Sequence, residues 1–152
     1  MGTVTLDLSS PGETFELGRR LGAALREGDF VALMGDLGAG KTVFVRGAAE
    51  GAGAEPATSP TFALVNLYRG GRVALQHLDL YRLSGAAELF ALGFDDLLAT
   101  PAATLCEWAD RAGSSLPADR LEIVFAIAGT EQRQATLVAH GPRAAELLAA
   151  LR

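Results

Sequence analysis

The chain has 152 residues, of which 49% are hydrophobic and 20% are charged, a balance that suits one globular domain over residues 1–152 and excludes a disordered chain. Its formal net charge of −5 argues against a broad nucleic-acid-binding face, because neutralising phosphates requires clustered Lys and Arg. No apolar run reaches the roughly 18 residues of a membrane-spanning helix, and the N-terminus lacks the charged and apolar regions of a signal peptide.

The first predicted elements are a short strand and a helix. Val4–Leu8 alternates in polarity, which predicts a strand that can lie at a sheet edge. Ser10 and Glu13 have the spacing of a capping box, and Pro11 lies at the favoured first helical position. A helix is therefore expected from this box to about Leu25.

The next stretch carries a phosphate-binding motif. The apolar run Phe30–Met34 has strand length, and residues 42–50 can continue as a helix. The loop between them fits the pattern G-x-x-x-x-G-K-[ST] without a mismatch. Its residues are Gly35, Asp36, Leu37, Gly38, Ala39, Gly40, Lys41 and Thr42. Strand, glycine loop and helix is the order in which backbone amides and a helix N-terminus surround phosphate oxygens, so nucleotide binding is predicted.

Two residues of this loop have predicted roles of their own. Lys41 would reach the β- and γ-phosphates, and the Thr42 hydroxyl would bind Mg²⁺. Lys41 is also the only lysine of the chain; the other basic residues are arginines. A compact ammonium on a thin stem can enter a loop that a planar guanidinium cannot. The alternative is a glycine-rich turn with an incidental lysine.

A hydroxyl-rich segment and a predicted hairpin follow. Thr58–Thr61 comes shortly after the predicted P-loop helix, where many P-loop enzymes place a segment that senses the γ-phosphate. A plain turn is the alternative. Residues 62–68 and 72–79 are predicted strands, with Gly70 and Gly71 as the hairpin signal between them.

Asp79 ends the second of these strands. An acid at this place, one strand after the P-loop helix, can hold Mg²⁺ through water; a strand-end aspartate can also cap the next turn. His77 is interpreted as a solvated or hydrogen-bonded strand histidine. Short helices are predicted over residues 86–92 and 94–99, and their adjacent acids Asp95 and Asp96 are expected to face solvent.

Another apolar run, Ala102–Cys106, predicts a strand that leads to Glu107 and Trp108. Ligands of open α/β sheets bind beyond the carboxyl ends of the strands, so the loop, Asp79 and Glu107 are expected to converge at one edge. Glu107 could orient the attacking water or bind Mg²⁺ directly. Trp108 could pack against the nucleotide base or against the core.

Cys106 is the only cysteine, which excludes an internal disulfide and suits a reducing cytosol, so a cytoplasmic protein is predicted. It lacks an obvious activating base and is interpreted as a small buried hydrophobic residue. Residues 120–128 and 133–139 then predict an antiparallel pair, His140 falls in a linker, and residues 142–151 predict a helix. The whole pattern predicts an α/β fold, a P-loop NTPase-like three-layer fold with a mixed, mostly parallel sheet and a C-terminal antiparallel hairpin.

Five stretches occur in a set order: GDLGAGKT (35–42), SPTF (59–62), LVNLY (64–68), HLDLYRL (77–83) and CEW (106–108). Together they resemble the TsaE (YjeE) family, bacterial P-loop ATPases needed to make threonylcarbamoyladenosine in tRNA. The similarity runs from about Ser10 to about Val138. Many enzymes share the P-loop, whereas SPTF followed by HxDLYRL and EW is much more specific.

The resemblance implies Mg²⁺-dependent ATP binding and slow hydrolysis by a small protein that acts with the TsaD–TsaB complex. That complex would carry the threonylcarbamoyl transfer, and tRNA would be reached only through it; no membrane is involved. By position, Lys41 and Thr42 match the family's phosphate and Mg²⁺ residues. Asp79 matches its acidic second motif, and Glu107 matches the glutamate implicated in metal binding and hydrolysis.

The resemblance also extends the expected nucleotide site to Val43, Thr61 and Trp108. Thr58–Thr61 matches a loop that resembles a GTPase switch. Val43 departs from the family pattern, because relatives often have a second threonine there that can contact the α-phosphate. Ala109 also departs, since the tryptophan is often followed by proline.

Two other functions remain open at this point. A small-molecule kinase needs an acceptor pocket and usually an arginine-bearing lid, but the arginines are scattered and no lid insertion is visible in the sequence. A nucleotide-gated binding module without useful turnover would use the same P-loop. GTP preference is disfavoured because a chain with one lysine has no [NT]-K-x-D sequence.

Overall fold

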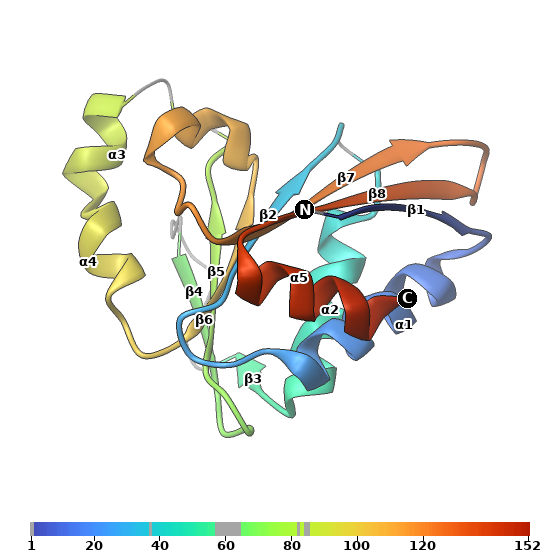
Figure 1. The fold of residues 1–152 in the computed structure, drawn as a ribbon, viewed down its shortest axis with the longest axis horizontal. Coiled ribbons are helices and arrows are strands. Elements are labelled where there is room, and N and C mark those ends of the chain that lie inside the picture. Colours follow the sequence, from blue (N-terminus) through green and yellow to red (C-terminus); the bar gives the residue numbers. More distant parts are fainter. Residues whose placement is uncertain (1, 37, 57–64, 82, 84–85) are drawn as a thin grey trace.

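A mixed sheet with helices on both faces forms the framework of the computed structural model (Figure 1). The structure describes residues 2–36, 38–56, 65–81, 83 and 86–152. Within that part of the chain the sheet has eight strands, in the order β1-β8-β7-β2-β6-β5-β4-β3. The four central strands, β7, β2, β6 and β5, are parallel to one another, and each outer strand is antiparallel to its inner neighbour. The predicted α/β fold is confirmed.

The strands and helices have the following bounds. The strands are β1 (Thr3–Leu8), β2 (Phe30–Met34), β3 (Glu55–Pro56), β4 (Val65–Arg69), β5 (Leu75–Asp79), β6 (Ala103–Glu107), β7 (Arg120–Ile127) and β8 (Arg133–His140). The helices are α1 (Pro11–Ala24), α2 (Lys41–Ala52), α3 (Ala86–Leu92), α4 (Phe94–Leu98), the 3₁₀ helix η1 (Ala109–Ser115) and α5 (Pro142–Leu151).

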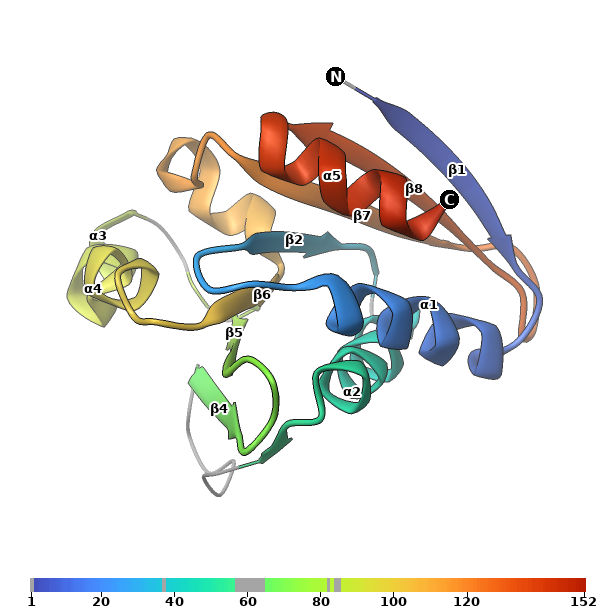
Figure 2. The same ribbon diagram turned by 60° about the horizontal axis from the view of Figure 1, so that its bottom comes forward.

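The sheet separates two helical layers, with α1, α2 and α5 on one face and α3, α4 and η1 on the other (Figures 1 and 2). Strand β2 shows why, because its side chains alternate between two cores. Val31 and Leu33 belong to the core under α1, α2 and α5. Phe30 and Ala32 belong to the core under α3, α4 and η1. A fully apolar strand is what a central parallel position with both faces covered requires.

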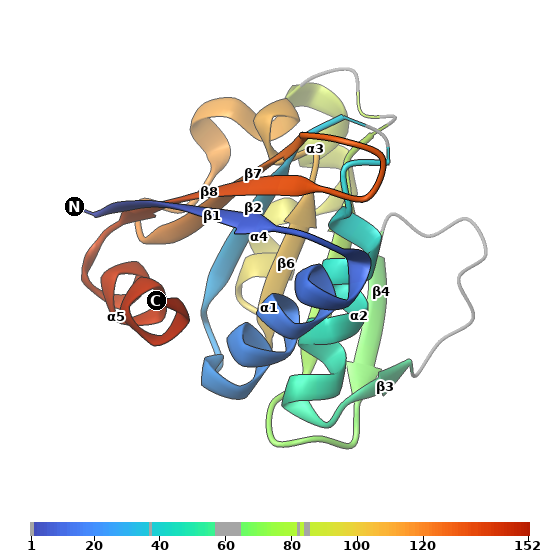
Figure 3. The same cartoon turned by 90° about the vertical axis from the view of Figure 1, so that its right-hand side faces the viewer.

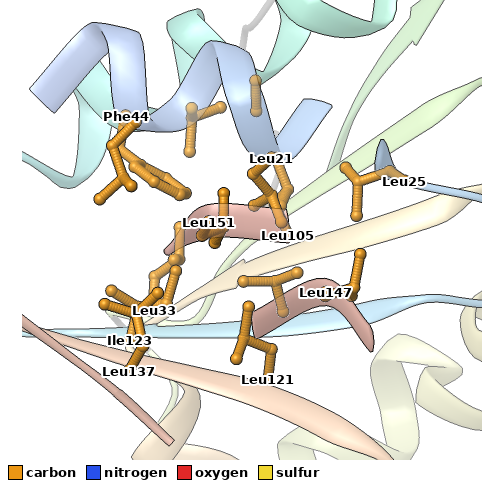
Figure 4. Close-up of a cluster of buried hydrophobic side chains, with 14 of the residues drawn as sticks. Leu21, Leu25, Leu33, Phe44, Leu105, Leu121, Ile123, Leu137, Leu147 and Leu151 are labelled. Atoms are coloured by element: carbon orange, nitrogen blue, oxygen red, sulfur yellow. The ribbon is translucent and has the colours of Figure 1, made fainter. Parts of the chain in front are cut away.

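The larger core lies between the sheet and α1, α2 and α5 (Figure 4). Ten of its side chains are labelled in Figure 4, and they come from or directly follow three helices (α1, α2 and α5) or lie on four strands (β2, β6, β7 and β8). They are Leu21, Leu25, Leu33, Phe44, Leu105, Leu121, Ile123, Leu137, Leu147 and Leu151. Burial of this kind stabilises the fold by roughly 25 cal/mol per Å² of apolar surface removed from water, so this core fixes α2 against the sheet.

Helices α1 and α2 lie side by side and approach closely through glycines (Figures 2 and 3). Each helix contributes two glycines four residues apart, which places both on one face. They are Gly18, Gly22, Gly47 and Gly51. A Cβ at Gly22 would lie 2.0 Å from the Ala48 carbonyl oxygen, and one at Gly51 would lie 1.9 Å from the Arg19 carbonyl oxygen. The contact therefore admits only glycine at these positions and holds α2 firmly against α1.

Several boundaries differ from the sequence prediction. Strand β6 includes Glu107, because this residue continues the parallel pairing with β2 and β5. His140 is the last residue of β8, where it pairs with Arg120, and does not lie in a linker. The short strand β3 and the 3₁₀ helix η1 had no sequence signal. Part of the predicted strand 62–68 lies outside the described residues.

Other sequence interpretations agree with the structure. β1 is an edge strand, Asp95 and Asp96 are exposed, and Cys106 is fully buried, which raises the pKa of its thiol. None of the helices in the described part of the chain is long and apolar enough to cross a membrane.

Candidate functional site

The phosphate-binding motif lies at the carboxyl edge of the parallel strands. It joins the end of β2 to the start of α2, which begins at Lys41. Asp79 and Glu107 are the last residues of β5 and β6, and they lie directly opposite each other in the parallel register. The three segments thus meet at one edge of the sheet, where ligands of open α/β folds bind.

A cavity of about 280 Å³ opens at this edge. It is lined by Gly38, Gly40, Lys41, Thr42, Val43, Asp79, Tyr81, Glu107 and Trp108. All of these except Tyr81 are residues that the sequence marked for a nucleotide, metal or catalytic role. Gly35, Asp36 and Ala39 belong to the loop but do not line the cavity, and Leu37 and Thr61 lie outside the described residues, as does the whole predicted sensor segment 58–61.

Two glycines make the loop's path possible. Gly35 follows β2 so closely against β7 that a Cβ would lie 2.5 Å from the Phe125 carbonyl oxygen. Gly40 has φ 108°, in the left-handed region that favours glycine, and it is the N-cap of α2. Because glycine offers no side chain to cap the helix, the first amides of α2 remain directed at the loop. A helix start of this kind attracts anions.

Lys41 places a buried cation inside the loop. Its side chain is nearly fully buried, with 4% of the residue exposed. Its Nζ donates a hydrogen bond of 2.5 Å to the Gly35 carbonyl oxygen and lies 3.7 Å from the ring centroid of Trp108, within cation–π range. Burial lowers the pKa of Lys41, and the nearby carboxylates of Glu107 and Asp79 act in the opposite direction. A desolvated ammonium interacts with phosphate more strongly than one in water.

Trp108 closes the cavity from the other helical layer. Its φ of 56° makes it the only non-glycine residue in the left-handed region within the described ranges, and this turn directs the chain from β6 into η1. The ring contacts Tyr81, with centroids 5.0 Å apart, and the Arg111 guanidinium carbon lies 5.6 Å from its centroid. Trp108 also packs against the smaller core. Trp108 therefore packs against the core and forms a wall of the cavity. That its ring stacks on a nucleotide base stays a prediction.

The two acids are held in different ways. Asp79 Oδ1 accepts a hydrogen bond of 3.0 Å from the Tyr81 amide, so Asp79 does cap the next turn. Glu107 is 6% exposed, and its Oε2 lies 2.5 Å from Nε2 of His77. Both carboxylates nevertheless line the same cavity as Thr42.

These donors fit Mg²⁺ only with help from a nucleotide. The described residues contain no group of three or more His, Cys, Asp and Glu side chains arranged to hold a metal alone. Mg²⁺ usually binds through one or two carboxylates, waters and substrate phosphates. The Thr42 hydroxyl with the Asp79 and Glu107 carboxylates supplies the all-oxygen donor set that suits this ion.

Three residues contact the site beyond those assigned a role from the sequence. Tyr81 lines the cavity, His77 contacts Glu107, and Arg133 donates from Nη2 and Nε to the Gly38 carbonyl oxygen at 3.1 and 3.3 Å. His77 could have been found by strand alternation, since residues i and i+2 share a face and Asp79 follows it by two. Arg133 had no local signal, because it comes from the far hairpin β7–β8.

Comparisons with known proteins match this chain to one family over most of its length. The model of a family described as "Threonylcarbamoyl adenosine biosynthesis protein TsaE" matches residues 8–135. The tRNA threonylcarbamoyladenosine biosynthesis protein TsaE of Bacillus subtilis (strain 168) is 39% identical over 135 residues, which cover 88% of this chain and 84% of that protein. The protein of the same description from Treponema pallidum (strain Nichols) is 37% identical over 129 residues, 84% of this chain and 95% of its own length. The crystal structure of YdiB from Bacillus subtilis matches with a TM-score of 0.83 and 34% identity, covering 99% of this chain and 94% of that one.

Proposed function

This chain belongs to the TsaE family of threonylcarbamoyl adenosine biosynthesis proteins, and from that premise we propose that it is a Mg²⁺-dependent ATPase that acts with the TsaD–TsaB complex in the cytoplasm. The observation that carries the proposal is the cavity at the start of α2, which is lined by the buried Lys41 together with Asp79 and Glu107. A buried cation, an uncapped helix N-terminus and two carboxylates are the parts that phosphoryl transfer requires.

Phosphate binding falls to the loop and to Lys41. The amides at the start of α2 and the loop glycines surround the phosphate oxygens, and Lys41 neutralises their charge in a site shielded from water. Residues Gly35 to Val43, with Thr61, form the expected nucleotide contacts. Trp108 is the expected wall beside the nucleotide.

Hydrolysis falls to the carboxylates. Thr42, Asp79 and Glu107 would hold Mg²⁺, which when bound neutralises the charge that develops on the phosphates. Glu107 orients the attacking water by accepting its hydrogen bond. Asp79 Oδ1 accepts a hydrogen bond from the Tyr81 amide, so Asp79 would hold the metal, directly or through water, with Oδ2. Catalysis of this kind depends on position more than on covalent chemistry.

Within the modification pathway, the protein would power or reset the TsaD–TsaB cycle. TsaD and TsaB would carry the threonylcarbamoyl transfer, and this chain would meet tRNA only through them. Its net charge of −5 supports that indirect route, because direct tRNA binding is favoured by a basic surface. Among the described residues that line the cavity none is an arginine, whereas a small-molecule kinase usually carries an arginine-bearing lid.

The test compares phosphate release and nucleotide affinity for the wild type, Lys41→Ala and Glu107→Ala, each with and without TsaD–TsaB. We expect Lys41→Ala to lose ATP binding, and Glu107→Ala to keep affinity within about threefold while turnover falls by about 10²-fold or more. His140→Ala, on the other face of the sheet, serves as the control and should match the wild type. Unchanged turnover in Glu107→Ala would contradict its catalytic role.

A second arm separates the alternatives. Reconstituted tRNA modification should need the wild-type chain for multiple turnovers, and Lys41→Ala should not replace it. Full multiple-turnover modification without the protein would reject the proposal. ATP-dependent capture of TsaD–TsaB without phosphate release would indicate a binding module, and ATP-dependent labelling of a small acceptor would indicate a kinase.

A further inference from the structure

The chain has two histidines, and each contacts a glutamate of a neighbouring strand. His77 Nε2 lies 2.5 Å from Glu107 Oε2, and His140 Nε2 lies 2.6 Å from Glu122 Oε1. The first pair is the more buried, with side-chain exposures of 11% and 8% against 37% and 20%. The chain therefore contains a buried pair and a matched, more exposed one.

The two pairs lie on opposite faces of the sheet. Leu105 belongs to the core under α2, so Glu107, two residues later on β6, faces α2 as well. Leu121 belongs to that same core, so Glu122, the next residue of β7, points to the other face. Only the pair of His77 and Glu107 is on the P-loop side.

His77 reaches Glu107 from behind the cavity. Asp79 and Glu107 lie opposite each other at the strand ends and line the cavity, whereas His77 is two residues further back on β5 and is absent from the lining. Its imidazole is thus placed to act on the carboxylate of Glu107 and not on a ligand. Because a carboxylate oxygen accepts, the tautomer that makes this hydrogen bond is the one that carries its hydrogen on Nε2.

We propose that His77 is a positioning residue, which fixes the Glu107 carboxylate through Oε2 and so leaves Oε1 to face the cavity, where the metal and the attacking water would lie. A glutamate side chain has three rotatable bonds, and one hydrogen bond from a buried ring removes most of that freedom. Charge-assisted bonds of this kind are among the strongest in proteins. The inference rests on the proposed role of Glu107 in hydrolysis and adds the group that makes its orientation reproducible.

The contact also has a purely structural interpretation, in which His77 only compensates the burial of Glu107. The two interpretations differ in what they change. Compensation alone affects the stability of the fold, whereas positioning affects turnover without affecting nucleotide affinity. Partners that orient a functional carboxylate or ligand typically contribute about 10- to 100-fold to activity.

The test uses two substitutions that keep different nitrogens of the imidazole. The His77→Gln amide can reach the place of Nε2, whereas that of His77→Asn can replace only Nδ1. We expect His77→Asn to lower ATP turnover by about 10- to 100-fold with nucleotide affinity unchanged within about twofold, and His77→Gln to recover most of the loss. His140→Asn should behave as the wild type. Equal losses in both His77 variants, or loss of affinity alone, would overturn the proposal.

A double substitution separates this inference from the proposed function. In a Glu107→Ala background, His77→Asn should cause no further loss of turnover, because its effect passes through Glu107. If Glu107→Ala itself hydrolyses ATP normally, the proposed function of Glu107 fails. If Glu107→Ala is impaired and His77→Asn is not, or if their effects multiply, only the positioning role fails.

A spectroscopic measurement keeps the test valid even if His77→Asn does not fold. Imidazole ¹⁵N NMR of the wild type should show two pairs of signals, one pair for each histidine, and Glu107→Gln should shift Nε2 of His77 while leaving the signals of His140 in place. Glu122→Gln should give the converse. A His77 signal that does not respond to Glu107→Gln would contradict the hydrogen bond on which the proposal depends.

Discussion

The face of the sheet under α1, α2 and α5 differs from the face under α3, α4 and η1 in how its helices are anchored. On the first face, α1 and α2 meet through glycines at backbone contact and cover a continuous core. On the second face, the core formed by the described residues is smaller, and Phe90 of α3 leaves 85% of its surface exposed. We call the layer of α1, α2 and α5 the closed layer, and the layer of α3, α4 and η1 the partly open layer.

The candidate site draws on both layers, but for different purposes. The closed layer supplies the P-loop and Lys41, whose positions depend on backbone geometry at the start of α2. The partly open layer supplies Trp108, which lines the cavity just before η1, and Arg111, whose guanidinium carbon lies 5.6 Å from the Trp108 ring centroid. The phosphate-binding loop therefore rests on the closed layer, and the Trp108 wall of the cavity rests on the partly open one.

The largest expected effect comes from removing a ring from each core. Phe44 is fully buried in the closed layer and meets Phe125 edge to face at 5.3 Å, so Phe44→Ala should cost about 3–5 kcal/mol of unfolding free energy. Phe94 of the other core meets Phe30 at 6.4 Å. Phe94→Ala should cost about 3 kcal/mol or less, because a less enclosed site can collapse into the space. Urea denaturation measures both, and a larger loss at Phe94 would reverse the comparison.

The glycine contact predicts the next largest effect. Gly22→Ala puts a methyl group 2.0 Å from the Ala48 carbonyl oxygen, and overpacking of this kind costs about 1–3 kcal/mol or more. The loss should appear although alanine is about 1 kcal/mol better than glycine in a helix. Gly12→Ala, on the same helix, is the matched control, since its Cβ would lie 3.6 Å from Ser10 Oγ in an ordinary contact. If both variants are more stable than the wild type, the backbones of α1 and α2 do not approach each other as closely as the structure shows.

Much of the closed layer could be predicted from the sequence. The strand Phe30–Met34 was predicted with its observed bounds, because a short apolar run before a glycine loop has few other interpretations. The convergence of the loop with Asp79 and Glu107 followed from a general property of parallel sheets. Neither step needed knowledge of distant contacts.

What could not be predicted depends on contacts between segments far apart in the chain. Arg133 reaches the Gly38 carbonyl oxygen across 95 positions, and nothing local to either residue marks that pairing. His140 was assigned to a linker because glycine and proline follow it, yet pairing with β7 extends β8 to include it. The left-handed turn at Trp108 is likewise imposed by its surroundings, since tryptophan has no intrinsic preference for it.

A smaller effect is expected when the buried cation is removed. Because burial lowers the pKa of Lys41, the unfolded chain binds more protons between the lowered value and the ordinary value of 10.5, and stability rises with pH in that window. At neutral pH the buried ammonium therefore destabilises the fold. Lys41→Met should raise the unfolding free energy modestly at pH 7, and the gain should shrink as the pH approaches 10.5.

Thermal unfolding at pH 7 and at about pH 9.5, within the window set by the ordinary lysine pKa, checks this prediction. Arg46→Met, on the exposed side of α2, is the control and should change stability by less than about 0.5 kcal/mol at both pH values. A Lys41→Met protein less stable than the wild type at pH 7 would mean that the Gly35 carbonyl and the Trp108 ring more than compensate the burial. The closed layer would then gain stability from the Lys41 ammonium.

The smallest effect is expected at Phe90, the exposed aromatic side chain of α3. Leu89 is 3% exposed and its neighbour Phe90 is 85% exposed, so Leu89→Ser should destabilise the chain by about 2 kcal/mol or more while Phe90→Ser stays within about 0.5 kcal/mol. Urea denaturation at two protein concentrations measures both changes. A loss above about 1 kcal/mol for Phe90→Ser, growing with protein concentration, would mean that a second copy covers α3 in solution. The partly open layer would then be covered in solution, and Trp108 would no longer lie in the more exposed of the two layers.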